Sequence, residues 1–207
     1  MRVAIVGASG RCGRATAVRA LAAGYEVVSV VRSAANAPSS TTVAVADARD
    51  VAALTSALRG VDAVVTTLGH VKDSADVTIL RDGADALIRA AAATGVTRLV
   101  AVSAAGAYIQ GDDPLSRYLA KPLVAKLFGQ AFADTRDMED AIRASDLDWT
   151  ILRPSRLVGG ASGASYRSGI DTAVKWHYDT RFDTVGRAAI DALTTPAWSR
   201  HAVFITG

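Results

Sequence analysis

Short apolar runs rich in valine and isoleucine alternate with alanine-rich segments, and this alternation predicts strands and helices in turn. The runs are almost continuously apolar, which is typical of parallel strands buried on both faces of a sheet. The order of these elements predicts an α/β fold with a doubly wound parallel sheet. The predicted strands are residues 3–6, 27–31, 43–46, 63–67, 99–102 and 149–152, with 202–205 as a further candidate, and the predicted helices are 15–23, 51–58 and 77–93.

Two stretches interrupt this rhythm, residues 107–133 and 155–180. The second is rich in glycine and serine. Both follow the carboxyl ends of late strands, where open α/β sheets bind their ligands. We expect them to cover a small-molecule substrate, and the alternative is that they are ordinary surface connections.

Composition narrows the class of protein. The 207 residues are 50% hydrophobic, so we expect one domain over residues 1–207. No apolar stretch approaches the roughly 20 residues that span a bilayer, and a strand-like segment begins at Arg2, so we expect a cytoplasmic protein without membrane contact. The net charge of +3 comes without a basic stripe, which argues against nucleic acid. One cysteine and three scattered histidines argue against a disulfide and a metal site, and the protein is expected to be a monomer or homodimer.

The sequence Gly7-Ala-Ser-Gly10-Arg-Cys-Gly13 follows the first predicted strand and leads into the first helix. At such a junction glycine permits a tight turn, a close approach to a pyrophosphate, and close packing of helix and strand. The helix N-terminus offers free amides and a positive dipole end to the phosphates, and Ser9 adds a hydroxyl. The loop predicts a Rossmann-type dinucleotide site, the alternative being a simple tight turn.

The end of the second predicted strand distinguishes NADP from NAD. NAD sites usually carry a carboxylate there for the ribose 2′-hydroxyl, whereas this strand ends in Arg32 and Ser33. A guanidinium suits a 2′-phosphate by charge and geometry. Arg11 is expected to approach the same phosphate, so NADP(H) is the predicted cofactor. The alternative is that Arg32 is only a solvated charge.

Two later strand ends are ambiguous when taken alone. Asp47 follows the third strand and is a candidate for the adenine side, although an aspartate after a strand is also a common helix cap. Leu68 and Gly69 follow the fourth strand, where a small residue lets the backbone lie against ribose and nicotinamide.

These residues resemble the atypical short-chain dehydrogenase/reductases, and within them the NAD(P)H-binding group that includes the flavin reductase/biliverdin-IXβ reductase. The likeness covers most of the chain. It continues through Gly95-Val-Thr-Arg-Leu-Val-Ala-Val-Ser103 and Asp148-Trp-Thr-Ile-Leu-Arg-Pro154. The resemblance implies a single doubly wound domain, with the residues from Pro154 to Arg156 near the nicotinamide. The cofactor site that it implies comprises Gly7, Ser9, Gly10, Arg11, Cys12, Arg32, Ser33, Asp47, Leu68, Gly69 and Ser103.

The chain departs from this family where acid–base chemistry would occur. Most short-chain dehydrogenases use a Tyr-X-X-X-Lys pair, whereas Tyr118 and Lys121 are one residue too close. A three-residue offset still shares a helix face, but the Lys-Pro sequence predicts that regular helix stops at or before Lys121. Arg156 and Thr135 stand where the biliverdin/flavin reductase carries histidines, which brings a bilin or flavin substrate into question.

A flavin or quinone accepts a hydride without a strong protein acid, whereas a simple ketone needs a proton donor. We therefore expect an NADPH-dependent reductase acting on a conjugated acceptor. Alternatives are a non-catalytic NADP sensor similar to the NmrA-type regulators and, less favoured in so short a chain, a sugar-nucleotide epimerase. The candidate catalytic residues are Ser103, Tyr118 and Lys121, and the candidate substrate residues are Tyr108, Arg153 and Arg156. Cys12 is interpreted as a small packing residue, although a helix N-terminus can lower a thiol pKa.

Overall fold

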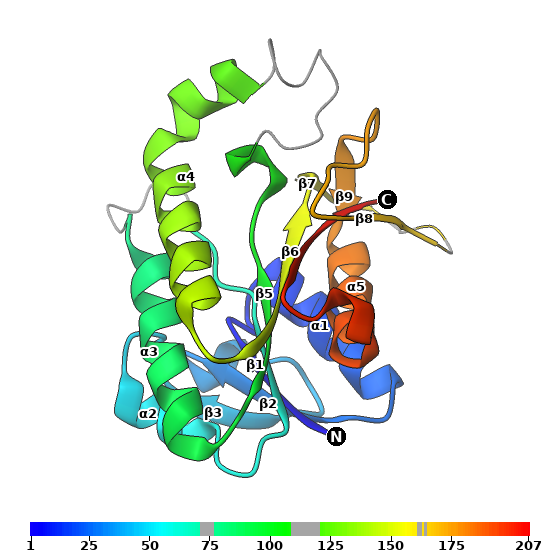
Figure 1. The fold of residues 1–207 in the computed structure, drawn as a ribbon. Coiled ribbons are helices and arrows are strands. Elements are labelled where there is room, and N and C mark those ends of the chain that lie inside the picture. Colours follow the sequence, from blue (N-terminus) through cyan, green and yellow to red (C-terminus); the bar gives the residue numbers. More distant parts are fainter. Residues whose placement is uncertain (71–76, 109–120, 161–162, 164) are drawn as a thin grey trace.

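Within the described residues, eight strands form one sheet in the order β3-β2-β1-β4-β5-β6-β10-β8. The computed structural model describes residues 1–70, 77–108, 121–160, 163 and 165–207, with the backbone alone for 121–128 (Figure 1). All neighbouring strands are parallel except β10 and β8, so the predicted doubly wound α/β sheet is confirmed with one antiparallel edge strand. The strands are β1 Arg2–Val6, β2 Glu26–Val31, β3 Thr42–Val45, β4 Ala63–Thr66, β5 Arg98–Val102, β6 Asp148–Pro154, β8 Arg167–Ile170 and β10 His201–Thr206.

The helices cover both faces of the sheet because successive strand residues point to opposite sides. In β1, Val3 and Ile5 pack under α1 and α5, whereas Ala4 and Val6 pack under α2, α3 and α4. Figure 1 shows the two helical layers on either side of the strands. The helices are α1 Arg11–Ala22, α2 Val51–Ala57, α3 Ile79–Thr94, α4 Lys121–Ala144 and α5 Phe182–Thr194.

The strand order reverses between β1 and β4. From β1 the chain builds outward through β2 and β3, and from β4 it builds in the other direction through β5 and β6. Open α/β sheets bind ligands in the crevice at the carboxyl ends of the two strands where this reversal occurs. The glycine loop follows β1 and the Thr67–Gly69 segment follows β4, so both lie at that crevice.

Two helix boundaries differ from the prediction. Helix α1 begins at Arg11 rather than at residue 15, because the chain turns directly into the helix after Gly10, whose backbone is extended. In the described residues α4 comprises Lys121–Ala144, so the helix runs through the Lys-Pro sequence and the prediction that it stops at or before Lys121 is wrong.

The region after β6 holds elements that the pattern did not predict. Short strands β7 Arg156–Val158 and β9 Asp179–Arg181 pair in parallel and form a small second sheet. Helix α5 follows and packs closely on α1, since a Cβ on Gly186 would lie 2.6 Å from the backbone of Ala15. In the part of the chain that the structure describes, no helix is both long and apolar enough to cross a membrane.

Candidate functional site

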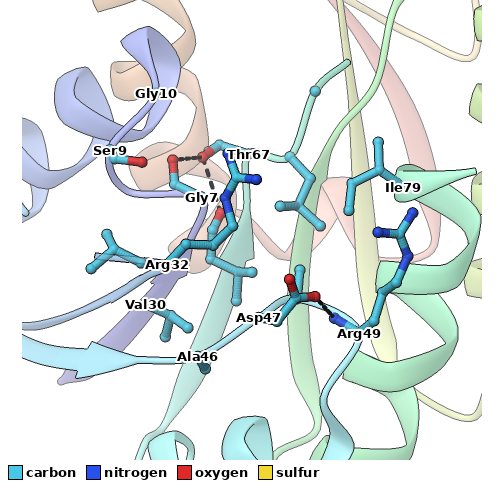
Figure 2. A pocket seen from close by; sticks show the side chains of 15 residues that line it. Gly7, Ser9, Gly10, Val30, Arg32, Ala46, Asp47, Arg49, Thr67 and Ile79 are labelled. Carbon is cyan, nitrogen blue, oxygen red and sulfur yellow. Dashed lines mark hydrogen bonds between the residues drawn. The ribbon is translucent and has the colours of Figure 1, made fainter. Parts of the chain in front are cut away.

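A groove runs across the carboxyl ends of β2, β1 and β4, as the crevice between β1 and β4 predicts (Figure 2). The glycine loop forms its floor, and Ile79, the first residue of α3, closes one side. The residues that line it are Val6, Gly7, Ser9, Gly10, Val30, Val31, Arg32, Ala46, Asp47, Ala48, Arg49, Thr67, Leu68, Gly69 and Ile79.

Two glycines of the loop are required by backbone geometry. Gly7 has a φ of +82°, which side-chain-bearing residues rarely adopt. A Cβ on Gly13 would lie 2.3 Å from the carbonyl oxygen of Gly7, so only glycine lets α1 begin this close to the loop. The first turn of α1 therefore meets the loop directly, which is the arrangement that binds phosphates at a helix N-terminus.

Side chains from outside the motif hold the loop in place. The hydroxyl of Thr67 donates to the carbonyl oxygens of Val6 and Gly7, at 3.1 and 3.2 Å. The guanidinium of Arg14 donates to the carbonyl oxygens of Ser9 at 3.0 Å and Asn36 at 2.7 Å. Sequence reasoning missed Arg14, because its bonds join the loop to the segment after β2 and only the tertiary structure brings them together.

Two arginines border the groove beyond the loop. Arg32 is exposed at the end of β2, and Arg49 follows β3 (Figure 2). The Nε atom of Arg49 lies 3.3 Å from a carboxylate oxygen of Asp82. Asp47 accepts a hydrogen bond from the Arg49 amide, whereas the helix cap of α2 is Asp50. The sequence alternative that made Asp47 a helix cap is therefore wrong, and Arg49 joins the groove without having been predicted.

Arg11, Ser33 and Cys12 are among the predicted cofactor residues that lie apart from the lining. The Arg11 guanidinium stacks on Phe182 of α5, with its carbon 4.4 Å from the ring centre. It thus faces α5 rather than the Arg32 end, contrary to the expectation of a shared phosphate. Ser33 precedes a short 3-10 helix at Ala34–Asn36. Burial raises the pKa of the Cys12 thiol to about 11 and outweighs the lowering effect of the Arg11 charge.

A second polar cluster lies at the ends of β5 and β6. Glu139 of α4 is fully buried and pairs with Arg153 of β6, whose Nε and Nη2 donate to the two carboxylate oxygens at 3.1 and 2.7 Å. Arg143 also pairs with Glu139, and the Ser103 hydroxyl donates to it at 2.5 Å. Because Ser103 gives its only proton to Glu139, its oxygen can accept a hydrogen bond from a ligand but does not donate one.

The predicted substrate residues near this cluster contact other side chains of the protein. Arg153 is buried, and its guanidinium stacks 3.3 Å from the centre of the Tyr108 ring. Burial and the nearby Glu139 raise the pKa of Tyr108, which makes its hydroxyl a weak acid. Arg156 is exposed and pairs with Asp179 across the β7–β9 sheet at 2.8 Å. These contacts favour structural roles for both arginines over the predicted substrate contacts.

The remaining predicted site residues are Pro154, Tyr118 and Lys121, and the structure describes them to different extents. Pro154 is buried at the end of β6, beside Ile205 of β10. Tyr118 lies outside the described residues, and Lys121 is described as the first residue of α4 without its side chain. The pairing of Tyr118 with Lys121 therefore stays a prediction. Glu139 was missed, because a single glutamate in a polar helix gives no sign of its burial.

The fold and groove define a dinucleotide-binding α/β protein. A glycine loop enters a helix at the reversal of strand order, and the groove crosses that loop. The sequence profile of the NAD(P)H-binding family matches residues 7–196, which begins at the first glycine of the loop. The chain belongs to this NAD(P)H-binding family, so the family expected from the residues is confirmed.

Curated relatives match different shares of their own length. An uncharacterized protein of Mycobacterium tuberculosis is 40% identical over 104 residues, which is 50% of this chain and 12% of that protein. The 3-diazoavenalumate denitrifying reductase of a Streptomyces species is 34% identical over 178 residues, covering 79% of this chain and 58% of the reductase. The chain thus spans only a small part of the mycobacterial relative.

Solved structures show the same fold at low sequence identity. A short-chain dehydrogenase/reductase of Veillonella parvula, solved in complex with NADP, has a TM-score of 0.84 at 17% identity and covers 100% of this chain and 94% of its own. ChuY, an anaerobillin reductase of Escherichia coli O157:H7, has a TM-score of 0.79 at 23% identity, with 100% and 97% covered.

Proposed function

We propose that this protein is an NADPH-dependent reductase that transfers a hydride to a conjugated small-molecule acceptor such as a flavin or a quinone. The observation that carries the proposal is the groove at the reversal of strand order, with the glycine loop at its floor and Arg32 at its end. Membership of the NAD(P)H-binding family supports the binding of a nicotinamide dinucleotide. The residues of this chain support the proposed preference for NADPH and the proposed class of acceptor.

The residues of the groove fit a dinucleotide phosphate. The absence of a Cβ at Gly13 leaves the helix start against the loop, where amides and the helix dipole favour an anion. Arg32 stands where an NAD site would carry a carboxylate, and a guanidinium there attracts the extra phosphate of NADPH. Asp47 and Arg49 border the same end of the groove and are proposed to contact the adenosine.

The groups around the other end favour an acceptor that needs no strong acid. NADPH supplies the hydride when it is bound. The proton of Ser103 is given to Glu139, and the raised pKa of Tyr108 disfavours loss of its proton. A conjugated acceptor spreads the negative charge that the hydride brings, so a weak acid completes its reduction. A simple ketone would form an alkoxide, which Ser103 and Tyr108 are poorly suited to protonate.

The names of two similar proteins agree with the proposed reductase activity. One acts on 3-diazoavenalumate and the other is an anaerobillin reductase, by their names. Neither name transfers its substrate to this chain. They support the reaction class, because both proteins are named reductases.

The experiment is to incubate the purified protein with NADPH and, in turn, FMN, riboflavin, a benzoquinone, a naphthoquinone and a simple ketone, and to follow loss of NADPH absorbance. Turnover with one or more of the conjugated acceptors and little with the ketone is expected. NADPH binding in a calorimeter without oxidation by any acceptor would overturn the reductase proposal and favour the sensor alternative.

A further inference from the structure

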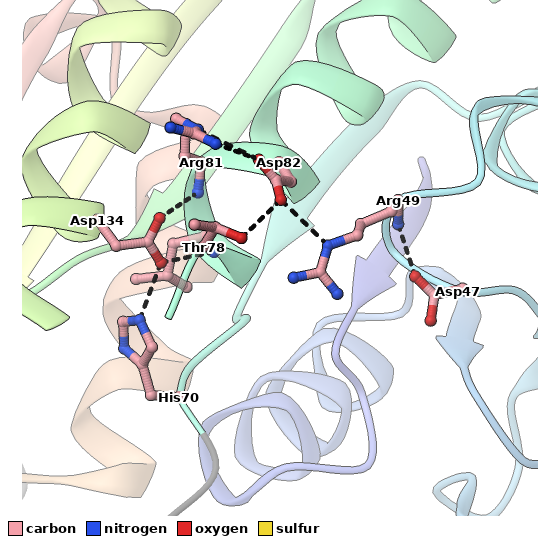
Figure 3. Close-up of polar contacts among 8 residues, drawn as sticks. Asp47, Arg49, His70, Thr78, Arg81, Asp82 and Asp134 are labelled. Atoms are coloured by element: carbon pink, nitrogen blue, oxygen red, sulfur yellow. Dashed lines mark hydrogen bonds and ion pairs between the residues drawn. The ribbon is translucent and has the colours of Figure 1, made fainter. Parts of the chain in front are cut away.

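His70 lies at the crevice between β1 and β4 and has no role in the site described above. It directly follows Gly69, which lines the groove. Its ring Nε2 is 2.9 Å from a carboxylate oxygen of Asp134 in α4 (Figure 3). A histidine on a buried carboxylate, one residue from a cofactor groove, is an arrangement that can hold and deliver a proton.

Asp134 is held firmly in the orientation that this contact needs. It is only 4% exposed and accepts hydrogen bonds from the amides of Leu80 and Arg81, at 2.9 and 3.0 Å. These amides belong to the first turn of α3, where the helix dipole also favours a negative charge. Because two main-chain amides hold it, the carboxylate sets the position of the imidazole ring.

The same turn of α3 connects His70 to the groove. Leu80, whose amide binds Asp134, follows Ile79, which lines the groove. Asp82, two residues further, holds the groove residue Arg49 (Figure 3). His70 and Arg49 are therefore both linked to the first turn of α3, His70 through Asp134 and Arg49 through Asp82.

The chemistry of the ring leaves one nitrogen for a ligand. Nε2 is used by Asp134, and among the described residues Nδ1 makes no hydrogen bond. Figure 3 shows that nitrogen on the side of the ring away from Asp134. A carboxylate behind an imidazole fixes the orientation of the ring, as in other His–Asp pairs.

We propose that His70, oriented by Asp134, delivers from Nδ1 the proton that completes reduction of the acceptor. This rests on the proposed reductase function. The acceptor gains two electrons and one hydrogen as hydride from bound NADPH, and one proton from His70, so NADPH, acceptor and one proton yield NADP⁺ and reduced acceptor. His70 is left neutral and regains its proton from water. Asp134 is a positioning residue that touches neither acceptor nor cofactor.

The alternative is that the His70–Asp134 pair is only a tie between the segment after β4 and α4. Two substitutions separate these roles. His70→Gln keeps an N–H donor near the Nε2 position for Asp134 but has no proton to release. His201→Asn is the matched control, because His201 is the other described histidine paired with an aspartate, Asp171 at 2.6 Å, and it lies at the opposite edge of the sheet.

The test measures kcat with the best acceptor, together with the NADPH dissociation constant. The proposal expects His70→Gln to lower kcat by about 100-fold and to leave NADPH affinity within twofold. His201→Asn should match the wild type in both. A His70→Gln variant that retains kcat within twofold overturns the proposal.

A second readout does not depend on turnover. In ¹⁵N NMR spectra of the histidine side chains, addition of NADP⁺ to the intact protein should shift the His70 ring signals and leave those of His201 unchanged. If no acceptor is reduced, the reductase function fails, and this spectrum alone decides whether His70 faces the cofactor groove. Unchanged His70 signals at saturating NADP⁺ would overturn the placement.

Discussion

The two ends of the site are built by different means. At the nucleotide end, the main chain makes the site, through a positive φ at Gly7 and the contact that Gly13 permits. At the proposed acceptor end, side chains make it, through a buried glutamate that holds two arginines and a serine. The first depends on residues close in sequence, and the second on α4, β5 and β6 coming together.

This difference separates the glycine loop, which is constrained in every member of the family, from the side-chain cluster, which one member can change. Every protein that binds a dinucleotide in this way needs the same backbone conformation at the pyrophosphate, so glycine is needed at fixed spacing. A side-chain cluster can be rebuilt around another substrate while the sheet stays the same. Substitutions at one end of the site at a time test this difference between main chain and side chains.

The largest effect is expected at Glu139. Glu139→Ala leaves the buried Arg153 without its carboxylate, so the free energy of unfolding should fall by about 3–5 kcal/mol, measured by urea denaturation. Asp140→Ala is the control, since that side chain is 78% exposed and should cost less than about 0.5 kcal/mol. Equal losses in the two variants would mean that the acceptor end is not held by the buried ion pair.

The next effect is expected at the nucleotide end. Gly13→Ala places a Cβ 2.3 Å from the Gly7 carbonyl oxygen, so the loop must shift and NADPH affinity should fall by at least about 100-fold, or about 2.7 kcal/mol. Gly129→Ala in α4 meets nothing within 4 Å and should bind normally. Fluorescence titration with NADPH gives both constants. Normal affinity in Gly13→Ala would remove the glycine loop from the site.

Cys12 tests whether the nucleotide end carries reactive chemistry. Because burial raises its pKa from 9.0 to about 11, the thiolate fraction at pH 8 is about 100-fold below that of a free thiol. Alkylation by iodoacetamide at pH 8 should be slower by a similar factor in the native protein, and recover in urea. Rapid alkylation of the folded protein would show a reactive cysteine instead of a packing residue.

The smallest effect is expected for cofactor choice. Arg32→Asp should weaken NADPH binding about tenfold more than NADH binding, because it removes a cation from an exposed site and adds a carboxylate. Arg59→Asp makes the same charge change after α2, at the opposite edge of the sheet, and should leave the ratio unchanged. If Arg32→Asp keeps the wild-type preference, Arg32 does not bind the 2′-phosphate.

The sheet was predictable because its strands are short, continuously apolar and separated by glycine-terminated helices, as at Gly24 and Gly95. The glycine loop was predictable for the same local reason. Arg14, Arg49 and Glu139 were not, because each acts through a partner that is distant in sequence or through burial that its neighbours conceal. The small β7–β9 sheet was missed because most of its sequence lies in residues 155–180, which were interpreted as irregular, and α5 lies just beyond that stretch and was not predicted.

The central claim is that one cofactor joins the two ends, and a crystal structure of the protein with NADP⁺ tests it most directly. The account predicts the pyrophosphate on the Gly7–Gly13 loop, the 2′-phosphate within hydrogen-bond distance of Arg32, and the nicotinamide between His70 and Ser103. A nucleotide bound elsewhere, or a nicotinamide directed away from His70 and Ser103, would contradict it.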